Sequence, residues 1–571
     1  MNPERYIAIV RTGDNELAWD ALAARVSDRT LVRYDISPEI RILAAQGLSV
    51  LQGPECVVVG GMFGDTGAAM RASVRPDEII ARCWGNYLAI GMNAGGKPDW
   101  ILRAPLGHLP AYRMCAGDCM AFASHPDLLL SAFGQSPEID WDFAIEHLAF
   151  AHLVIARTGL RGIDELLPGE CLSRQSDMSW RREAVWTPWA WTQSDRVIDD
   201  PAKAAEALRT AVNGAVANLL PAKEPCLLEL SGGLDSSVLA AALAIGRIAA
   251  QAVTLRTPGT ESDEREYARA TALATGLPLT EIEVSSDVRP TTLERLRSAR
   301  PGMPGLLSAA DQVLAELGRE RGVTAFVSGA GGDCVFCSPV SAAPAADVMI
   351  RLGLRQSRQT IEELARIHYA SFWEVARMAW RQSRRPPLHD RWPITPGFLV
   401  PDLVPRVVPD HPWFNPPSDI LPGKRSHVRT ILGALAHVAD YRRHDIAPSR
   451  FPLLSQPVVE TTLRIPSWLW TSRGQDRAIA RNAYHGFLPQ RVLDRRVKGG
   501  LDAYCIAIAE AHRGQLRPFL LEGHLAHRGI IDRKAVEACL SRSARRDDPA
   551  IYRLFPLVDL EGWARGWLGV P

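Results

Sequence analysis

Two short segments rich in glycine, serine and aspartate carry the residues of this 571-residue chain that are best suited to chemistry. The first segment, Ser231–Ser237, follows the apolar run Leu227–Leu230 and reads Ser-Gly-Gly-Leu-Asp-Ser-Ser. It leads into an Ala/Leu-rich stretch that predicts a helix from Val238 to about Ala250. A strand, a glycine-rich turn and a helix N-terminus together favour anion binding, because free backbone N–H groups and the helix dipole both attract negative charge.

The second segment, Ser328–Asp333, reads Ser-Gly-Ala-Gly-Gly-Asp and follows another β-rich run, Val323–Val327. Loops at the carboxyl ends of neighbouring parallel strands face one crevice, so we expect Asp235 and Asp333 to lie close together. Two carboxylates suit Mg²⁺, which completes its shell with phosphate oxygens and water. Neither loop ends in Gly-Lys-Ser/Thr, so a Walker-type phosphate loop is excluded.

The elements between the loops must place them at one edge of a sheet. The residues predict strands at 251–255 and 279–284, and helices at 262–276 and 311–322. Strands that alternate with helices are typical of an α/β domain with a doubly wound parallel sheet.

The first loop resembles that of the N-type ATP pyrophosphatases, which split ATP between its α and β phosphates. Together the two loops are similar to the synthetase domain of the asparagine synthetase B family. The later segment agrees with this resemblance, since Arg477 and Arg481 stand four apart in the helical pattern 475–484, before Leu488-Pro489 and the run 494–499. The resemblance implies that Lys498 in this run reaches the phosphates and the reacting carboxyl group.

Four N-terminal segments, 84–90, 102–108, 122–124 and 167–170, resemble the glutaminase domain of the same family. The resemblance implies an α/β protein with an antiparallel αββα-type glutaminase-like domain at 1–185. A doubly wound parallel-sheet PP-loop ATP pyrophosphatase (synthetase) domain would follow at 200–571, with 176–201 as linker. Glutaminases of this family use a cysteine at position 2 as nucleophile. This chain has Asn2, and its first cysteine is Cys56, so we expect no ammonia from glutamine.

The amine must then come with the substrate, as in the β-lactam synthetases and lasso-peptide cyclases of this family. Segments 411–413, 423–427 and 452–457 resemble the cyclases, and Ala330 stands where asparagine synthetases carry glutamate. We therefore predict macrolactam formation in a precursor peptide. ATP would adenylate an Asp or Glu side chain, and the N-terminal amine would displace AMP. The expected partners are the peptide and leader-binding or leader-protease proteins, and a β-lactam-type substrate is the alternative.

The predicted site residues fall into three groups. The catalytic residues are Lys498, Asp235 and Asp333, and the two carboxylates are also the predicted Mg²⁺ ligands. The residues predicted to bind ATP and pyrophosphate are Leu230, Ser231, Gly232, Gly233, Asp235, Ser236, Ser237, Leu255, Ser328, Gly329 and Lys498. Arg477 and Arg481 are expected to support them.

Two other classes of function have some sequence support. Cys334 and Cys337 form a C-x-x-C pair, which is also found in PP-loop enzymes that transfer sulfur and in half zinc sites. No second cysteine pair lies nearby, and two buried structural thiols are the favoured interpretation. A non-catalytic binding protein is disfavoured because both aspartates and the lysine are retained.

Composition limits the remaining choices. A net charge of +1 gives no support for nucleic-acid binding, and Arg381, Arg384 and Arg385 are interpreted as a solvated basic face. The sequence shows no apolar span of 18 residues and no secretory signal, so no membrane association is predicted. Ten cysteines without such a signal favour a reducing, cytoplasmic location.

A long segment, 342–450, is expected to interrupt the synthetase core. It combines predicted helical stretches within Thr360–Arg381 with the Pro-rich region 386–422. Its aromatic residues Trp392, Trp413 and Phe414 are expected either to line a peptide-sized pocket or to form local core.

Overall fold

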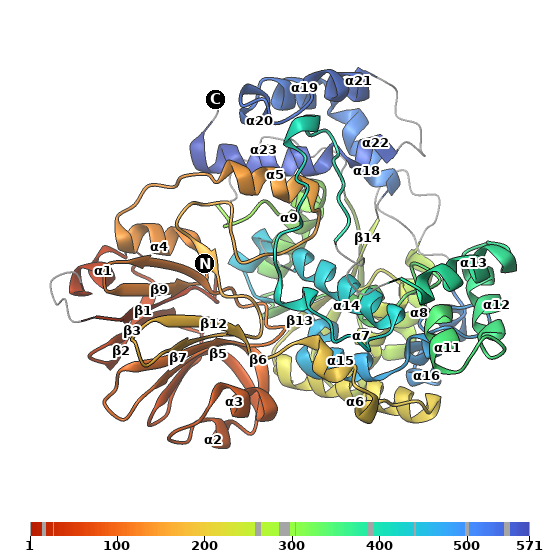
Figure 1. The fold of residues 1–571 in the computed structure, drawn as a ribbon, viewed down its shortest axis with the longest axis horizontal. Helices are drawn as coiled ribbons and strands as arrows, with labels where there is room; N and C mark the ends of the chain where they lie inside the picture. Colours follow the sequence, from red (N-terminus) through yellow and green to blue (C-terminus); the bar gives the residue numbers. More distant parts are fainter. Residues whose placement is uncertain are drawn as a thin grey trace.

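Three β-sheets organise the computed structural model, which describes residues 2–13, 19–26, 28–256, 264–284, 297–302, 304–385, 392–438, 441–496, 502–541 and 549–569. Two antiparallel sheets are stacked at the N-terminal end of the molecule (Figure 1). A parallel sheet lies beside them, and the last helices of the chain gather above both (Figure 1). The predicted mixed α/β fold, antiparallel first and parallel afterwards, is confirmed.

The two antiparallel sheets have six strands each. The first has the order β10-β8-β9-β1-β3-β2 and comprises β1 (Tyr6–Arg11), β2 (Leu31–Ser37), β3 (Ile40–Ala45), β8 (Tyr112–Ala116), β9 (Cys119–Ala123) and β10 (Asp164–Glu165). The second has the order β12-β11-β7-β6-β5-β4 and comprises β4 (Val50–Gln52), β5 (Cys56–Gly64), β6 (Cys83–Met92), β7 (Pro98–Arg103), β11 (Glu170–Arg174) and β12 (Trp180–Ala184). One apolar cluster, which includes Val10, Ile42, Val57 and Ile90, joins their facing sides.

Helices cover the outer faces of this pair of sheets (Figure 1). They are α1 (Trp19–Arg25) and α4 (Pro126–Phe133) on the first sheet, and α2 (Thr66–Ala69) and α3 (Pro76–Arg82) on the second. Central strands buried on both faces have no solvent side, which explains why β5 and β6 are apolar at consecutive positions. The predicted linker 176–201 is not irregular throughout, because it contains β12. The limits 1–185 and 200–571 stay a prediction.

The third sheet is parallel and has the order β15-β14-β13-β16-β17. Its strands are β13 (Cys226–Glu229), β14 (Ala250–Arg256), β15 (Leu279–Glu283), β16 (Ala325–Val327) and β17 (Ser449–Arg450). The chain runs outward from β13 through β14 to β15 and then returns to the other side of β13 as β16. The strand order therefore reverses between β13 and β16, which is where open α/β sheets bind ligands.

Helices around the parallel sheet begin and end at different residues from those predicted. They are α6 (Pro201–Leu219), α7 (Leu234–Ile245), α8 (Arg265–Thr275) and α9 (Pro304–Glu320). Helix α7 starts four residues before Val238, so Asp235 lies in its first turn, where a carboxylate is favourable. It ends at Gly246, before Arg247 with a positive φ of 52°.

The helical stretches predicted at 360–381 are present. The structure has two helices there, α12 (Ser357–Ile367) and α13 (Phe372–Ser383), which pack on α11 (Ala343–Arg351). Tyr369 lies between them with a φ of 51°, and Ser371 and Glu374 form a capping box that starts α13. Capping of a new N-terminus outweighs the helical periodicity that runs through the break.

The remaining helices surround the sheets. They are α5 (Trp141–Ala149), α10 (Gly332–Val335), α14 (Pro422–Ala434), α15 (Gln456–Arg464), α16 (Ala478–Ala483), α17 (Gln490–Leu493), α18 (Asp502–Ala511), α19 (Arg513–Leu521), α20 (His524–His527), α21 (Arg533–Ser541), α22 (Pro549–Tyr552) and α23 (Phe555–Leu568). No helix of the described residues is long and apolar enough to cross a membrane.

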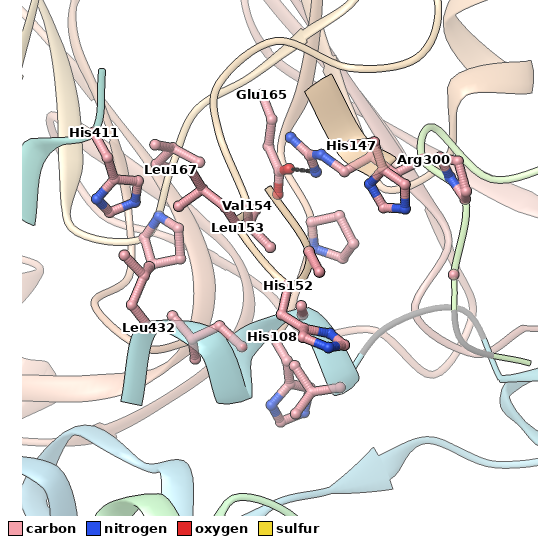
Figure 2. A pocket seen from close by; sticks show the side chains of 18 of the residues that line it. His108, His147, His152, Leu153, Val154, Glu165, Leu167, Arg300, His411 and Leu432 are labelled. Atoms are coloured by element: carbon pink, nitrogen blue, oxygen red, sulfur yellow. Dashed lines mark hydrogen bonds and ion pairs between the residues drawn. The ribbon is translucent and has the colours of Figure 1, made fainter. Parts of the chain in front are cut away.

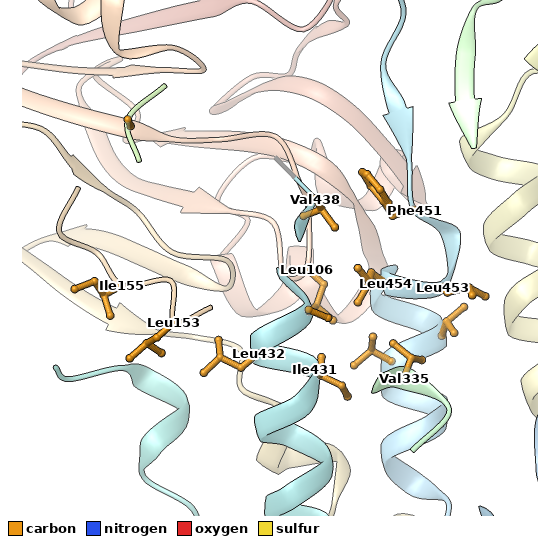
Figure 3. Packing of buried hydrophobic residues seen from close by; sticks show 14 of the residues in the cluster. Leu106, Leu153, Ile155, Val335, Ile431, Leu432, Val438, Phe451, Leu453 and Leu454 are labelled. Carbon is orange, nitrogen blue, oxygen red and sulfur yellow. The ribbon is translucent and has the colours of Figure 1, made fainter. Parts of the chain in front are cut away.

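One hydrophobic cluster runs across the boundary between the N-terminal sheets and the parallel sheet (Figure 3). It brings together Leu106 from the loop after β7, Ile431 from α14, Val335 from α10 and Leu454 from the segment after β17. The two parts of the chain thus share buried apolar surface.

Candidate active site

The first loop is held tightly between β13 and α7. Gly232 has a φ of 76°, and a Cβ there would lie 2.8 Å from the Ala268 nitrogen and the Glu264 oxygen at the start of α8. A side chain at position 232 is therefore excluded both by its backbone conformation and by space. The Ser231 and Ser236 hydroxyls are 3.2 Å apart and close the turn.

The second loop lies directly against the first. A Cβ on Gly329 would lie 2.9 Å from the Ser236 nitrogen, and one on Gly332 would lie 2.5 Å from the Asp235 Cβ. These glycines allow two backbones to approach more closely than any other residue permits. The structure thus places the two loops together, as their positions after the adjacent strands β13 and β16 require.

Arg477 joins the carboxylates of the two loops. Its Nη1 donates to Asp235 Oδ1 at 3.2 Å and to Asp333 Oδ1 at 2.6 Å. The Asp235 side chain is 10% exposed and that of Asp333 is 39% exposed, so only the Asp333 carboxylate is well accessible to solvent. Burial by itself lowers the pKa of Arg477, but the charges of Asp235, Asp476 and Asp333 raise it above its ordinary value.

The sequence did not single out Asp476, which organises both predicted arginines. Its carboxylate lies 3.0 Å from Arg477 Nε and 3.1 Å from Arg481 Nη2, and it accepts the Ser338 hydroxyl at 2.8 Å. Arg477 has a φ of 53° and precedes α16, whereas Arg481 lies within that helix. The two guanidiniums therefore do not share a helical face: Arg477 reaches the loops, and Arg481 donates to the Leu493 carbonyl.

Arg495 is a second contact that the sequence did not assign. Its Nη1 donates to the Gly232 carbonyl at 3.1 Å, its Nη2 pairs with Glu264, and its guanidinium lies 4.4 Å from the centroid of the Tyr267 ring. The signal was available, because Arg495 belongs to the same basic run as Lys498. This arginine connects the segment after α17 to the first loop.

The other predicted residues have different surroundings. Lys498 lies outside the described residues. The Ser237 hydroxyl is fully buried and 3.1 Å from the Thr271 hydroxyl, so its side chain faces α8. Leu230 is also fully buried, and Leu255 is half-buried against the core beneath the sheet. Their proximity to an adenosine stays a prediction.

The donor set suits a hard divalent cation. Asp235 and Asp333 supply carboxylate oxygens from two loops to one guanidinium nitrogen, which shows that a single positive centre can contact both. Mg²⁺ needs few protein ligands when phosphate is present. No group of three or more His, Cys, Asp or Glu side chains in the described ranges is arranged to hold a metal by itself.

Cys337, of the cysteine pair beside the second loop, lacks the lowered thiol pKa of a sulfur-transfer site. Cys334 is partly exposed, whereas Cys337 is buried, and burial raises the pKa of the Cys337 thiol to about 12. Thiols that transfer sulfur need a lowered pKa, because the thiolate is the nucleophile.

A cavity of about 300 Å³ lies behind the second loop, between the N-terminal sheets, α14 and α23 (Figure 2). Burial lowers the pKa of His108 and His147 to about 4 and that of His411 to about 3, so these imidazoles are neutral at pH 7. Trp413 lines the cavity, and its side chain is only 3% exposed. It therefore fits both expectations for this residue, a pocket wall and local core. Leu454 separates the cavity from the loop, because it lies 2.7 Å from where a Cβ on Gly331 would be.

Near Asn2, side chains are bonded to one another. Glu4 pairs with Arg450 Nη1 at 2.6 Å, and the Asn2 amide lies 3.2 Å from His125 Nε2. Arg450 belongs to β17, and its carbonyl accepts the Ser328 N–H at 3.1 Å. The N-terminus therefore contacts the strand that supports the second loop.

Comparison with known proteins gives one family. Residues 207–565 match the family described as asparagine synthase. A search of curated proteins finds no match. Similar solved structures include a glutamine phosphoribosylpyrophosphate amidotransferase from B. subtilis complexed with ADP and GMP (11% identity, 62% of this chain and 79% of that chain, TM-score 0.18). Another is described as the allosteric regulatory enzyme of purine biosynthesis (12% identity, 62% and 74%, TM-score 0.19). TM-scores this low support no argument about the fold.

Proposed function

Because the chain belongs to the asparagine synthase family, we propose that it closes a macrolactam ring in a ribosomally made precursor peptide. Membership of the family makes it an ATP-dependent ligase that forms a C–N bond and releases AMP. The macrolactam substrate, the roles of the individual residues and the use of Mg²⁺ go beyond family membership and are part of the proposal. The peptide, the leader-binding or leader-protease partners and the cytoplasmic location expected from the sequence belong to it as well.

The contact of Arg477 with Asp235 and Asp333 is the observation that carries the catalytic part. The two carboxylates would hold Mg²⁺, which neutralises phosphate charge when bound. The N–H groups of the first loop, at the start of α7, would bind the phosphate oxygens. Arg477 would move from the carboxylates to the phosphates, because a guanidinium pairs equally well with either group.

The reaction has two steps. An oxygen of an Asp or Glu side chain attacks the α-phosphorus, and pyrophosphate leaves. The N-terminal amine of the peptide then attacks the acyl carbon, and AMP leaves with the new amide formed. Holding both ends of one peptide in a single site makes the second step effectively unimolecular, which contributes up to roughly 7–11 kcal/mol.

Two features favour a peptide over the β-lactam-type alternative. Segments 411–413, 423–427 and 452–457 resemble the cyclases. Ala330 of the second loop supplies no carboxylate at the position where asparagine synthetases carry glutamate. The sulfur-transfer alternative is disfavoured by the raised pKa of Cys337.

The test is mass spectrometry of a candidate leaderless peptide incubated with the full chain, ATP and Mg²⁺. We expect the peptide to lose one water only with ATP, and AMP and pyrophosphate to appear in equal amounts. ADP and phosphate as products would contradict the assignment of the loops. Cyclisation of a small amino-acid derivative, with peptides ignored, would establish the β-lactam-type alternative.

Lys498 gives a separate prediction. Lys498→Ala should still bind ATP but lose the cyclised product, because the resemblance places this ammonium at the phosphates and the reacting carboxyl group, and the other loop contacts to ATP remain. The measurement is equilibrium binding of ATP beside the mass assay. Loss of ATP binding together with activity would contradict this role.

A further inference from the structure

The outer face of α13 shows an unusual combination of aromatic and basic side chains. Trp373, Arg377, Trp380 and Arg384 are spaced i, i+4, i+7 and i+11, so they form one stripe along the helix. We call these four residues the α13 stripe. The opposite face of α13, with Val375 and Ala379, is buried against α11 and α12.

Exposed large apolar side chains are frequent in the segment that contains α11, α12 and α13. Trp373 is 79% exposed and Trp380 is 43% exposed. Of the 18 exposed large hydrophobic residues in the described part of the chain, seven lie in this short region: Ile350, Leu352, Leu354, Tyr369, Trp373, Met378 and Trp380. Such a concentration on a polar surface marks an interaction site.

The positive charge of this face is not balanced by the chain. Within the part of the chain that the structure describes, Arg377, Arg381, Arg384 and Arg385 form no ion pair with a carboxylate. The one acidic residue on this helix, Glu374, is used in the capping box with Ser371. The guanidinium of Arg384 lies 4.1 Å from the centroid of the Trp380 ring. A stacked guanidinium keeps its N–H groups directed outward in its own plane, where a carboxylate can accept them.

We propose that the α13 stripe is the docking surface for an acidic, amphipathic segment of a partner protein. Carboxylates of the segment would pair with Arg377 and Arg384, and its apolar side chains would cover Trp373 and Trp380. Tryptophan and arginine together are the residues that most often dominate the binding energy of protein interfaces.

The same pattern disfavours an anionic membrane. An interfacial helix inserts a continuous apolar face and keeps its basic residues on the other side. The continuous apolar face of α13 is already buried in its own bundle, and Arg377 separates the two tryptophans of the stripe. The helices α11, α12 and α13 lie on the side of the parallel sheet away from the N-terminal sheets (Figure 1).

The test uses the full chain and two fluorescent synthetic helices with leucine on one face, flanked by glutamate in one and by lysine in the other. Fluorescence anisotropy should show binding of the glutamate helix that weakens with added salt. Trp373→Ala with Trp380→Ala should weaken it at least about tenfold. Arg377→Glu with Arg384→Glu should abolish it and allow the lysine helix to bind.

Matched controls lie on other surfaces. Leu273→Ala removes a side chain that is 87% exposed on α8, and Arg247→Glu reverses a charge after α7; neither should change binding. Circular dichroism should show that every variant keeps its helix content. Equal binding of both helices, or no binding of the glutamate helix, overturns the proposal. Tryptophan-dependent binding to vesicles of equal phosphatidylcholine and phosphatidylglycerol also overturns it, in favour of a membrane.

Discussion

The site at the two glycine-rich loops, called the cleft below, and the interface with the N-terminal sheets both contain arginine–carboxylate contacts, but these contacts have different surroundings. In the cleft, Arg477 spans two carboxylates from separate loops, and one of them, Asp333, remains 39% exposed. At the interface, Glu4 and Arg450 are 20% and 18% exposed and pair with each other across two domains. Deeper in the same interface, Glu165 is 5% exposed and lies between Arg103 and Arg300.

The difference separates groups that can exchange partners from groups that fix a structure. A guanidinium shared by two acids beside an open side can be displaced by a metal ion and bind phosphate instead. A buried ion pair has no such exchange, and loss of either partner leaves an uncompensated charge. The N-terminal part of the chain therefore contacts the second loop indirectly: Glu4 pairs with Arg450 of β17, and the Arg450 carbonyl accepts the Ser328 N–H.

The largest expected effect concerns the cleft. Asp235→Asn or Asp333→Asn should lower AMP formation by about 10³-fold, because the amide cannot neutralise a metal–phosphate complex. The melting temperature should stay close to that of the wild type. The matched control is Asp402→Asn, an exposed aspartate in the short helix Pro401–Leu403, which should keep full activity. A near-normal rate for Asp235→Asn would contradict the metal role.

Substitutions at the interface with the N-terminal sheets should change the free energy of unfolding. Arg450→Met leaves Glu4 without its partner and should destabilise the fold by about 3 kcal/mol at pH 7, measured by urea unfolding. Adding Glu4→Gln to this variant should restore part of the loss, as a double-mutant cycle will show. Full additivity of the two changes would mean that the pair does not couple the domains.

The pH dependence of this pair has a defined direction. Burial raises the pKa of Glu4, but the charge and hydrogen bond of Arg450 lower it overall below 4.5. The stability that the pair contributes is therefore full above about pH 4.5 and is lost as the pH falls through the lowered pKa. The difference in unfolding free energy between wild type and Glu4→Gln should shrink over that range.

A second interface carboxyl group should behave in the opposite way. Burial raises the pKa of Glu460, which accepts from Trp186 Nε1 at 2.9 Å, to about 7. Its folded-state pKa exceeds the unfolded value, so stability falls as the pH rises from about 4.5 to about 7. Glu460→Gln should remove this slope and be more stable than the wild type by about 2 kcal/mol at pH 8. An unchanged slope in urea unfolding would contradict the shifted pKa.

The last prediction is that added glutamine has no effect on the reaction. Added glutamine should release no glutamate in step with product, because the N-terminal pocket has Asn2 against His125 and Glu4 against Arg450. Measurement of glutamate beside AMP checks this, with free ammonia as the comparison. Release of glutamate in amounts stoichiometric with product would contradict this expectation and show that the N-terminal half hydrolyses glutamine.

Local sequence determined the two loops, because glycines at tight turns and apolar strand runs are short-range signals. The β13 and β16 loops and the alternation of strands and helices were predicted from such runs, whereas the antiparallel N-terminal half was predicted from the family resemblance. The family resemblance carried the prediction to Arg477 and Lys498, which lie far along the chain. Helical stretches at 360–381 were predicted as well, but the position of the break between α12 and α13 was not, because it depends on the capping box at Ser371.

Tertiary structure alone decided which distant charges meet. Nothing in the spacing of Glu4 and Arg450, or of Arg495 and Glu264, indicates that they form pairs. The spacing also does not indicate that Arg477 contacts both Asp235 and Asp333. This residue precedes α16 and has a positive φ of 53°. Residue type sets what a side chain can bind, whereas the packing of sheets and helices sets which partner lies within its few ångströms of reach. The sequence by itself therefore determined the chemistry available to this protein, and the fold decided where that chemistry is open to a ligand and where it is closed into structure.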